Sequence, residues 1–217
     1  MHKLALLAIT LTVLTTTAPI AVGFADVSVG VKKGDWIEYQ VNASGNPPED
    51  YTIKWARMEV TDVQDTAISL DIQSQFLNGT IFPEHITLNL ATGVLGDDFV
   101  IPKNLNVGNQ FYDSSQGNIT ITGVEQRTAA GAQRTVISAA TNVTTFYWDK
   151  ETGILVAATS NMPTYTMVTE TNGTNIWQPQ TLGLEQTVFY VLVVAVVVVL
   201  AIIVAVLVWR RRKSLKN

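Results

Sequence analysis

Residues 188–209 are the feature that most constrains this chain, because they form a run of 22 residues without one charge. A helix of that length is about 33 Å long, enough to cross the hydrocarbon core of a bilayer. Four basic residues follow at once: Arg210, Arg211, Arg212 and Lys213. Because such clusters stay on the cytoplasmic side, we expect a transmembrane helix over 188–209, in preference to a core helix of a soluble domain.

The expected cytoplasmic tail, residues 210–217, is eight residues long and carries five positive charges. It can anchor the chain and touch anionic lipid, but it is too short to fold into a signalling domain. The predicted location is therefore the plasma membrane, in a type I orientation with the N-terminal domain outside the cell.

The N-terminus has the layout of a secretory signal peptide. A short charged head precedes an apolar run over 4–14, and small residues surround the end of the segment at Ala25. We expect cleavage after Ala25, which fits better than cleavage after Ala18, so the predicted signal peptide is 1–25. The alternative is an uncleaved anchor, but the apolar run is shorter than the roughly 20 residues that a spanning helix needs.

The segment between these ends is acidic and has no cysteine. It holds all 18 acidic residues of the chain and only eight basic ones, a net charge of about −10. Such a surface repels phosphate backbones, so nucleic acid is not an expected partner. The absence of cysteine excludes disulfide-stapled modules and thiolate metal sites, while a domain of this size can build a core without them.

The apolar pattern of residues 26–170 has a period of two, rich in Thr, Val, Ile and aromatic residues, and shows no amphipathic helix of useful length. We expect an all-β ectodomain, an antiparallel meander that forms a curved half-barrel or a sandwich. The predicted strands are 36–41, 52–60, 67–76, 85–90, 118–124, 134–140, 144–148, 154–159 and 164–170.

Beyond Glu170 the alternation fades, and residues 171–187 are expected to be an extended stalk between the β domain and the membrane. Asn-x-Ser/Thr sequons are the acceptors of N-linked glycans, which need exposed sites. Because the sequons of this chain fall between or beside the predicted strands, we expect glycans at strand ends. The five sequons begin at Asn42, Asn78, Asn118, Asn142 and Asn172.

Few residues offer catalytic chemistry. After signal cleavage His85 is the only histidine, and neither a Gly-x-Ser-x-Gly elbow nor a His-Glu-x-x-His motif is present. Two carboxylate pairs, Asp97 with Asp98 and Asp149 with Glu151, could do acid-base work or hold Ca²⁺, but they lack the spaced ligands of a calcium loop. We interpret them as solvated turn acids and His85 as a surface or strand histidine. No catalytic residue, metal site or cofactor is predicted.

One turn pattern occurs twice. "NLATGVL" from Asn89 and "DKETGIL" from Asp149 share an Asx residue, a Thr-Gly pair and two apolar residues. The shared chemistry predicts a turn in which the Asx side chain bonds the backbone and Gly93 or Gly153 takes a positive φ. Because the charges differ between the copies, they are not required by the turn.

Aromatic residues precede the second copy, in "FYW" at 146–148. Strand alternation puts Phe146 and Trp148 on one face and Tyr147 on the other. We expect any functional role of this stretch to depend on the rings, if Tyr147 faces a groove or cavity.

Four local motifs carry a resemblance: "GVKKGDWIEYQV" at 30–41, "FVIPKNLNVGNQFY" at 99–112, "AAGAQRTVISA" at 129–139 and "FYWDKETGILV" at 146–156. Together they resemble a group of uncharacterised archaeal exported proteins with a signal peptide, a β-rich ectodomain and a C-terminal anchor. The resemblance covers most of 26–159 and implies a cell-surface location, but no activity. At the level of fold, the expected curved sheet is also similar to bacterial lipoprotein-carrier half-barrels.

The leading hypothesis is a non-enzymatic, single-pass cell-surface glycoprotein that serves as an envelope or interaction module. Its expected partners are the membrane and cell-envelope proteins or glycans. The alternative is a binder or carrier of lipid or another apolar ligand within a curved β-sheet. An extracellular hydrolase is a remote third possibility.

Overall fold

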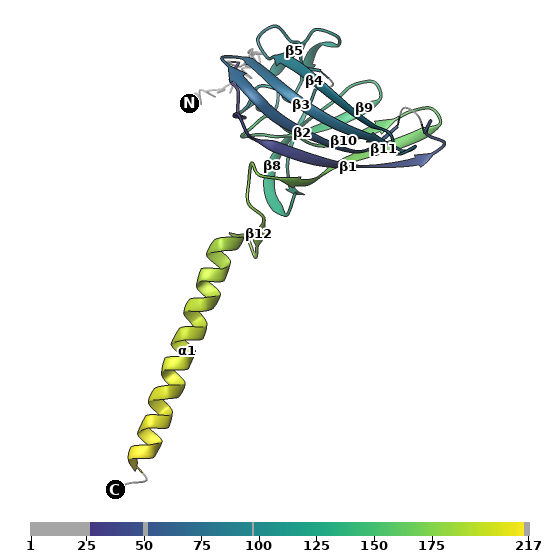
Figure 1. Cartoon of the computed structure of the whole chain (residues 1–217). Coiled ribbons are helices and arrows are strands. Elements are labelled where there is room, and N and C mark those ends of the chain that lie inside the picture. Colours follow the sequence, from purple (N-terminus) through teal and green to yellow (C-terminus); the bar gives the residue numbers. More distant parts are fainter. Residues whose placement is uncertain (1–26, 50–51, 97, 215–217) are drawn as a thin grey trace, which may run out of the picture.

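The β domain is built on one nine-stranded antiparallel sheet, which confirms the predicted fold class (Figure 1). The computed structural model describes residues 27–49, 52–96 and 98–214, so the predicted signal peptide lies outside the described residues. The strand order is β4-β3-β2-β1-β11-β10-β9-β8-β7. The strands of this sheet are β1 (Trp36–Gly45), β2 (Ile53–Gln64), β3 (Ala67–Phe76), β4 (Ile81–Asn89), β7 (Gly123–Ala129), β8 (Ala132–Ala140), β9 (Thr144–Asp149), β10 (Leu155–Asn161) and β11 (Tyr165–Thr174).

The sheet consists of two meanders, β1 to β4 and β7 to β11, which join where β1 pairs with β11. The segment 90–122 connects the meanders and carries the hairpin of β5 (Gln110–Asp113) and β6 (Gly117–Thr120). The sheet curls so strongly that β7 comes back into contact with β11. It is therefore an open half-barrel and not a sandwich of two sheets.

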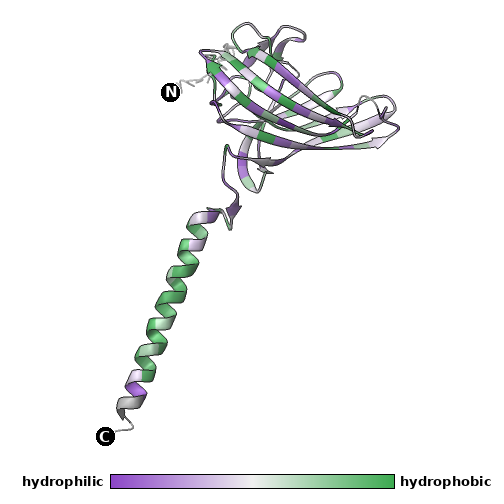
Figure 2. Ribbon diagram, in the orientation of Figure 1, coloured by the Kyte–Doolittle hydropathy of each residue, from purple (hydrophilic) through white to green (hydrophobic). Residues whose placement is uncertain are grey.

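The core lies on the concave face of this half-barrel. Along β3, for example, Ile68, Leu70 and Ile72 are buried while their neighbours are not. Figure 2 shows the resulting alternation of apolar and polar residues along the strands. The connecting segment 90–122 fills part of the concavity, and it supplies Leu95, Val100, Ile101, Leu105, Phe111, Ile119 and Ile121 to the same core.

The sequence pattern failed in one region of the sheet. The predicted strand over 118–124 is two strands, β6 and β7, in different sheets. Between them the buried Ile121 exchanges backbone hydrogen bonds with the loop before β5, at Gly108 and Asn109. The four-residue strand β5 was not predicted, because it is too short for its alternation to be recognised.

The predicted stalk over 171–187 is wrong for its first half. Strand β11 continues to Thr174, and the next residue is held by the domain: the Asn175 side chain accepts a hydrogen bond from the Trp36 backbone N–H at 2.8 Å and donates one to the Gly34 carbonyl at 2.8 Å. Trp177 is 7% exposed and donates its indole N–H to the Ala129 carbonyl at 2.9 Å. The buried ring of Trp177 and the hydrogen-bonded side-chain amide of Asn175 hold this part of the chain against the sheet.

After Trp177 the connection to the helix is short. It contains the two-residue strands β12 (Gln180–Thr181) and β13 (Leu184–Glu185), and the helix α1 (Gln186–Ser214) follows directly. Gln180 donates its backbone N–H to the Gly131 carbonyl at 2.8 Å, so the hairpin also touches the turn between β7 and β8. The β domain thus stands close to the start of the helix, not at the end of an extended stalk.

Helix α1 contains the predicted span 188–209 and extends beyond it at both ends. The part from Gln186 to Arg211 is 26 residues long, apolar, and not buried against the domain, and it is long and apolar enough to cross a membrane (Figures 1 and 2). Arg210, Arg211, Arg212 and Lys213 lie in its last turns, so much of the expected tail 210–217 is helical.

The two copies of the turn motif form similar turns. Asn89 Oδ1 accepts the backbone N–H of Thr92 at 3.2 Å, and Asp149 Oδ2 accepts that of Thr152 at 3.0 Å. Gly93 has φ 75° and Gly153 has φ 73°. At Gly153 the Ile101 carbonyl occupies the space that a Cβ would need, so the turn closes directly onto segment 90–122.

We expect Gly153→Ala to destabilise the domain by about 3 kcal/mol or more, because it combines an unfavourable φ with a clash against backbone. Gly34→Ala is the matched control, since Gly34 has φ 86° but nothing lies within 4 Å of the added Cβ. Its expected cost is about 1 kcal/mol, for the φ alone. Denaturant unfolding of the full chain in detergent, followed by near-UV circular dichroism, gives both values. Equal losses would show that the contact with Ile101 is unimportant.

Candidate functional site

A cleft of about 360 Å³ lies between the concave face of the sheet and segment 90–122. Its size is near the lower end for small-molecule sites. Most of the lining residues are apolar, and they come from six strands and from two points of the segment. They are Tyr39, Val41, Ile53, Ala56, Ser74, Asp98, Phe99, Gln116, Thr144, Phe146, Leu155, Ala158, Ser160, Met167 and Thr169.

The inner end of the cleft is closed. Tyr39 and Leu155 are almost fully buried there, and the Tyr39 hydroxyl donates a hydrogen bond to the Leu155 carbonyl at 2.8 Å. The ring of Phe99 lies 6.4 Å from that of Tyr39, between centroids. Burial raises the pKa of the Tyr39 hydroxyl, so this group stays neutral.

The other end is open. Ile53, Thr144, Ser160 and Met167 line it and are only half-buried. All four lie at one end of the strands, where β2, β9 and β11 begin and β10 ends. The β1–β2, β8–β9 and β10–β11 turns are at this end of the sheet. The Thr144 and Ser160 hydroxyls are 2.9 Å apart and hydrogen-bond to each other. The chain continues to α1 from the opposite end of the strands, so the mouth of the cleft points away from the start of the helix.

The aromatic residues of β9 divide between two faces of the sheet. Phe146 lines the cleft and stacks on the fully buried Trp148, with ring centroids 5.2 Å apart. Tyr147 lies on the other face, under the guanidinium of Arg127 at 3.7 Å from the ring centroid. The ring that faces the cleft is therefore Phe146 and not Tyr147.

Asp98 is the charged residue in the lining. It is 1% exposed, and its Oδ2 accepts a hydrogen bond from the Gln116 amide at 2.8 Å. Its backbone carbonyl accepts the indole N–H of Trp148 at 2.7 Å. The prediction of a solvated turn acid is thus wrong for Asp98, because segment 90–122 folds it inward; Asp97 lies outside the described residues.

Asp149 is also not a solvated turn acid. It is fully buried, and it accepts two hydrogen bonds from the Arg134 guanidinium, at 2.7 Å and 3.2 Å, besides those from Thr152. Glu151 is solvated, with 73% of its side chain exposed, and it accepts a hydrogen bond from Arg134 at 2.6 Å. Only the Glu151 side of this turn is exposed to solvent, because Arg134 of strand β8 covers the Asp149 side chain.

Arg134 contacts three other residues of this region, Asp149, Glu151 and Trp177. Burial would lower the pKa of its guanidinium, but the hydrogen bonds and negative charges of Asp149 and Glu151 outweigh that effect, so the pKa lies above its usual value. The guanidinium also lies 5.0 Å from the ring centroid of Trp177, in the segment before the helix. The Arg134 guanidinium and the two carboxylates pair with one another, so we assign them a role in stabilising the turn.

His85 lies in β4, as its sequence position predicts, and its Nδ1 is 2.6 Å from Asp71 Oδ1 on an exposed part of the sheet. Neither residue lines the cleft. Within residues 27–49, 52–96 and 98–214, no group of three His, Cys, Asp or Glu side chains could hold a metal ion.

The sequon asparagines are all exposed, although not all lie at strand ends. Asn78 and Asn142 are in the β3–β4 and β8–β9 turns, while Asn42, Asn118 and Asn172 lie within strands β1, β6 and β11. Asn172 is the extra residue where the β1–β11 register shifts. The expectation of strand ends is wrong for these three, but their side chains still face solvent.

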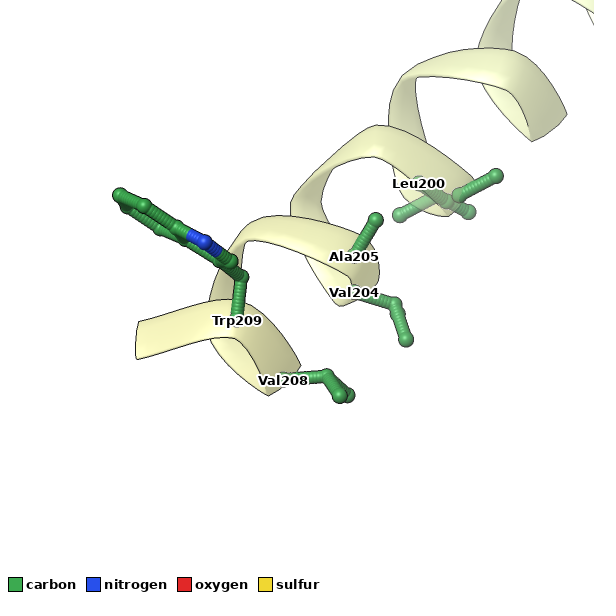
Figure 3. A pocket seen from close by; sticks show the side chains of 6 residues that line it. Leu200, Val204, Ala205, Val208 and Trp209 are labelled. Carbon is green, nitrogen blue, oxygen red and sulfur yellow. The ribbon is translucent and has the colours of Figure 1, made fainter. Parts of the chain in front are cut away.

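A larger hollow, of about 640 Å³, lies on the surface of α1 (Figure 3). It is lined by the small residues Ala201 and Ala205 and by larger side chains, among them Leu200, Val208 and Trp209. In a membrane this surface is covered by lipid or another helix. It is therefore not a candidate for a soluble ligand.

We expect Asp149→Ala to cost about 3–5 kcal/mol in unfolding free energy, because it leaves the Arg134 guanidinium without its buried partner. Glu151→Ala removes the exposed partner of the same guanidinium and should cost less than about 1 kcal/mol. Denaturant unfolding of the full chain in detergent measures both. Similar losses for the two variants would contradict the assignment of Asp149 as the buried support of this turn.

No family model matches this chain, and no curated protein matches its sequence. What the chain binds is therefore inferred from its own side chains and their geometry.

Proposed function

We propose that this chain is a non-enzymatic, single-pass cell-surface glycoprotein, an envelope or interaction module with its β domain outside the cell. The observation that carries the proposal is the helix α1, whose apolar span is not buried against the domain and ends in four basic residues. An apolar helix whose span is not buried against the described part of its own chain is matched to lipid. The basic end belongs on the cytoplasmic side, which gives a type I orientation in the plasma membrane.

The exposed sequons support an extracellular position for the β domain. Asparagines that are to carry glycans must be reachable from solvent, and all five meet this condition. The acidic surface and the glycans would suit contact with envelope proteins or glycans more than with nucleic acid. The resemblance to archaeal exported proteins agrees with this position and remains a prediction.

The lack of cysteine allows a direct test of orientation. Single-cysteine variants Gln73→Cys, at an exposed position of strand β3, and Ser214→Cys, at the C-terminal end of helix α1, are expressed in the native host. A membrane-impermeant maleimide should label the first on intact cells and the second only after permeabilisation. The reverse pattern, or labelling of both on intact cells, would contradict the type I orientation. Intact mass of the chain from that host, against Asn78→Gln and Asn142→Gln, measures glycan occupancy.

A second candidate function, binding of an apolar ligand, is favoured by the cleft. The connecting segment leaves part of the concave face uncovered, and Ala56, Phe146, Leu155 and Ala158 present apolar surface there. Each apolar group that a ligand covers gains about 25 cal/mol per Å² removed from water. A surface module of this kind would hold a lipid or another apolar molecule outside the cell.

We expect Ala158→Leu to reduce binding of an apolar ligand by about tenfold or more, because the larger side chain fills the cleft beside Phe146. Ala140→Leu makes the same change at an exposed position of β8, and it should leave binding unchanged. Native mass spectrometry of the full chain, released from nanodiscs that contain host lipid, measures the retained ligand. A wild-type chain that retains none would remove this second function.

A further inference from the structure

We infer that the hairpin of β12 and β13 is a second membrane contact of this chain, and that Leu182 at its tip inserts into the interfacial region of the bilayer that α1 spans. The inference rests on the proposed membrane span of α1. It adds an interaction surface outside that span, and its partner is the uncharged boundary between lipid head groups and acyl chains.

Leu182 has a backbone conformation that its residue type disfavours. Thr181 pairs with Leu184, so Leu182 and Gly183 form a two-residue turn, and their φ angles are 54° and 78°. Turns with two positive φ angles prefer Asn, Asp or Gly at the first position, because a larger side chain is disfavoured there. Leu182 is also 88% exposed, so packing within the described part of the chain does not account for it. An apolar side chain kept in such a position points to a role outside the fold of the domain.

The hairpin and the helix start from the same place. Gln186, the first residue of α1, donates its backbone N–H to the Pro179 carbonyl at 3.1 Å. From there the hairpin runs alongside the start of α1, since both of its strands contact the helix (Figure 1). Two residues of strand cover about 7 Å, and a helix needs about five residues to cover the same distance. The tip therefore lies beside the first turns of α1, where Phe189 and Tyr190 have the kind of ring that prefers the membrane interface.

The base of the hairpin is fixed to the β domain. Gln180 donates its backbone N–H to the Gly131 carbonyl at 2.8 Å, and its side-chain oxygen accepts the backbone N–H of Gln133 at 3.2 Å. Pro179 packs on Gly131, where an added Cβ would lie 3.1 Å from the Pro179 Cβ. Because the base is held by the domain and by the first residue of the helix, the direction of the tip is defined.

The chemistry of the hairpin fits lipid. Residues 171–184 contain no charged residue, in contrast to the acidic domain before them. Leu184 and Val188 are exposed as well, so apolar surface continues from the tip into the span. Glu185 is the first acidic residue after the tip, and it lies at the base of the hairpin, opposite Gln180. An apolar tip beside the end of a membrane span gains free energy when it enters the boundary between head groups and acyl chains.

The lack of cysteine allows a dye to be placed at single positions. Leu182→Cys, Ile81→Cys and Val191→Cys are each labelled with an environment-sensitive dye. The full chain is placed in phosphatidylcholine nanodiscs, with and without a lipid that carries a nitroxide quencher near its head group. Ile81 is the matched control, an apolar residue that is 61% exposed at the opposite end of the strands from the helix. We expect the dye at position 182 to be quenched at least about threefold more than at position 81.

Val191 lies in α1 and reports on the span itself. Strong quenching at position 191, with quenching at position 182 no greater than at position 81, would overturn the inference and leave the membrane span. A dye at position 191 that is not quenched would contradict the span and the inference together.

Leu182→Asn tests the side chain while it favours the turn, because Asn is preferred at positive φ. A dye at Leu184→Cys reports on the hairpin in this variant. We expect its quenching to fall at least about twofold when Leu182→Asn is introduced, since the apolar contact with lipid is lost. Ile81→Asn makes a similar change at the distant control position and should leave the quenching unchanged. Equal quenching at position 184 with and without Leu182→Asn would overturn the role of Leu182.

Discussion

The concave face of the half-barrel must be kept from water, and the segment 90–122 covers only part of it. Where the segment lies on the sheet, it forms a continuous core with residues such as Ile101, Leu105 and Phe111. Phe99 and Gln116 of the segment border the part of the sheet that it leaves uncovered, and the cleft lies there. The cleft is thus a direct result of a sheet that is longer than the segment that fills it. An apolar surface in this position is stable only if it is small or if something else covers it.

Strand β9 connects this core to the outer side of the sheet. Trp148 faces inward, where it supports Phe146 and holds the carbonyl of Asp98, while the next residue, Asp149, faces outward and pairs with Arg134. Both residues are fully buried, so β9 is covered on its two faces. The outer cover includes Trp177, which lies just before the helix. The same few residues therefore shape the cleft and hold the segment that leads to helix α1.

The sequence predicted the strands well, because an alternation of apolar and polar residues is a local property and most strands here have one face in the core. It predicted the turn at Asp149 for the same reason. It could not predict that this carboxylate is buried, since its partner Arg134 comes from another strand, 15 residues away. The cleft and the inward position of Asp98 depend on how segment 90–122 packs across the sheet, and that segment has only short strands. Trp177 was assigned to a stalk because a single aromatic residue in a polar stretch gives no periodic signal.

The position of the cleft relative to helix α1 follows from the strand directions. The helix begins nine residues after Trp177. The indole hydrogen bond of Trp177 holds it at the end of the sheet where β11 ends and β1 starts. The mouth of the cleft lies at the opposite end of the strands, where β11 starts and β10 ends, near Met167 and Ser160. In the proposed membrane location, a ligand that entered directly from the bilayer around α1 would have to travel the length of the sheet. If α1 spans a membrane and the cleft binds a ligand, as proposed, the arrangement suits a ligand that arrives from the side of the domain that faces away from the membrane.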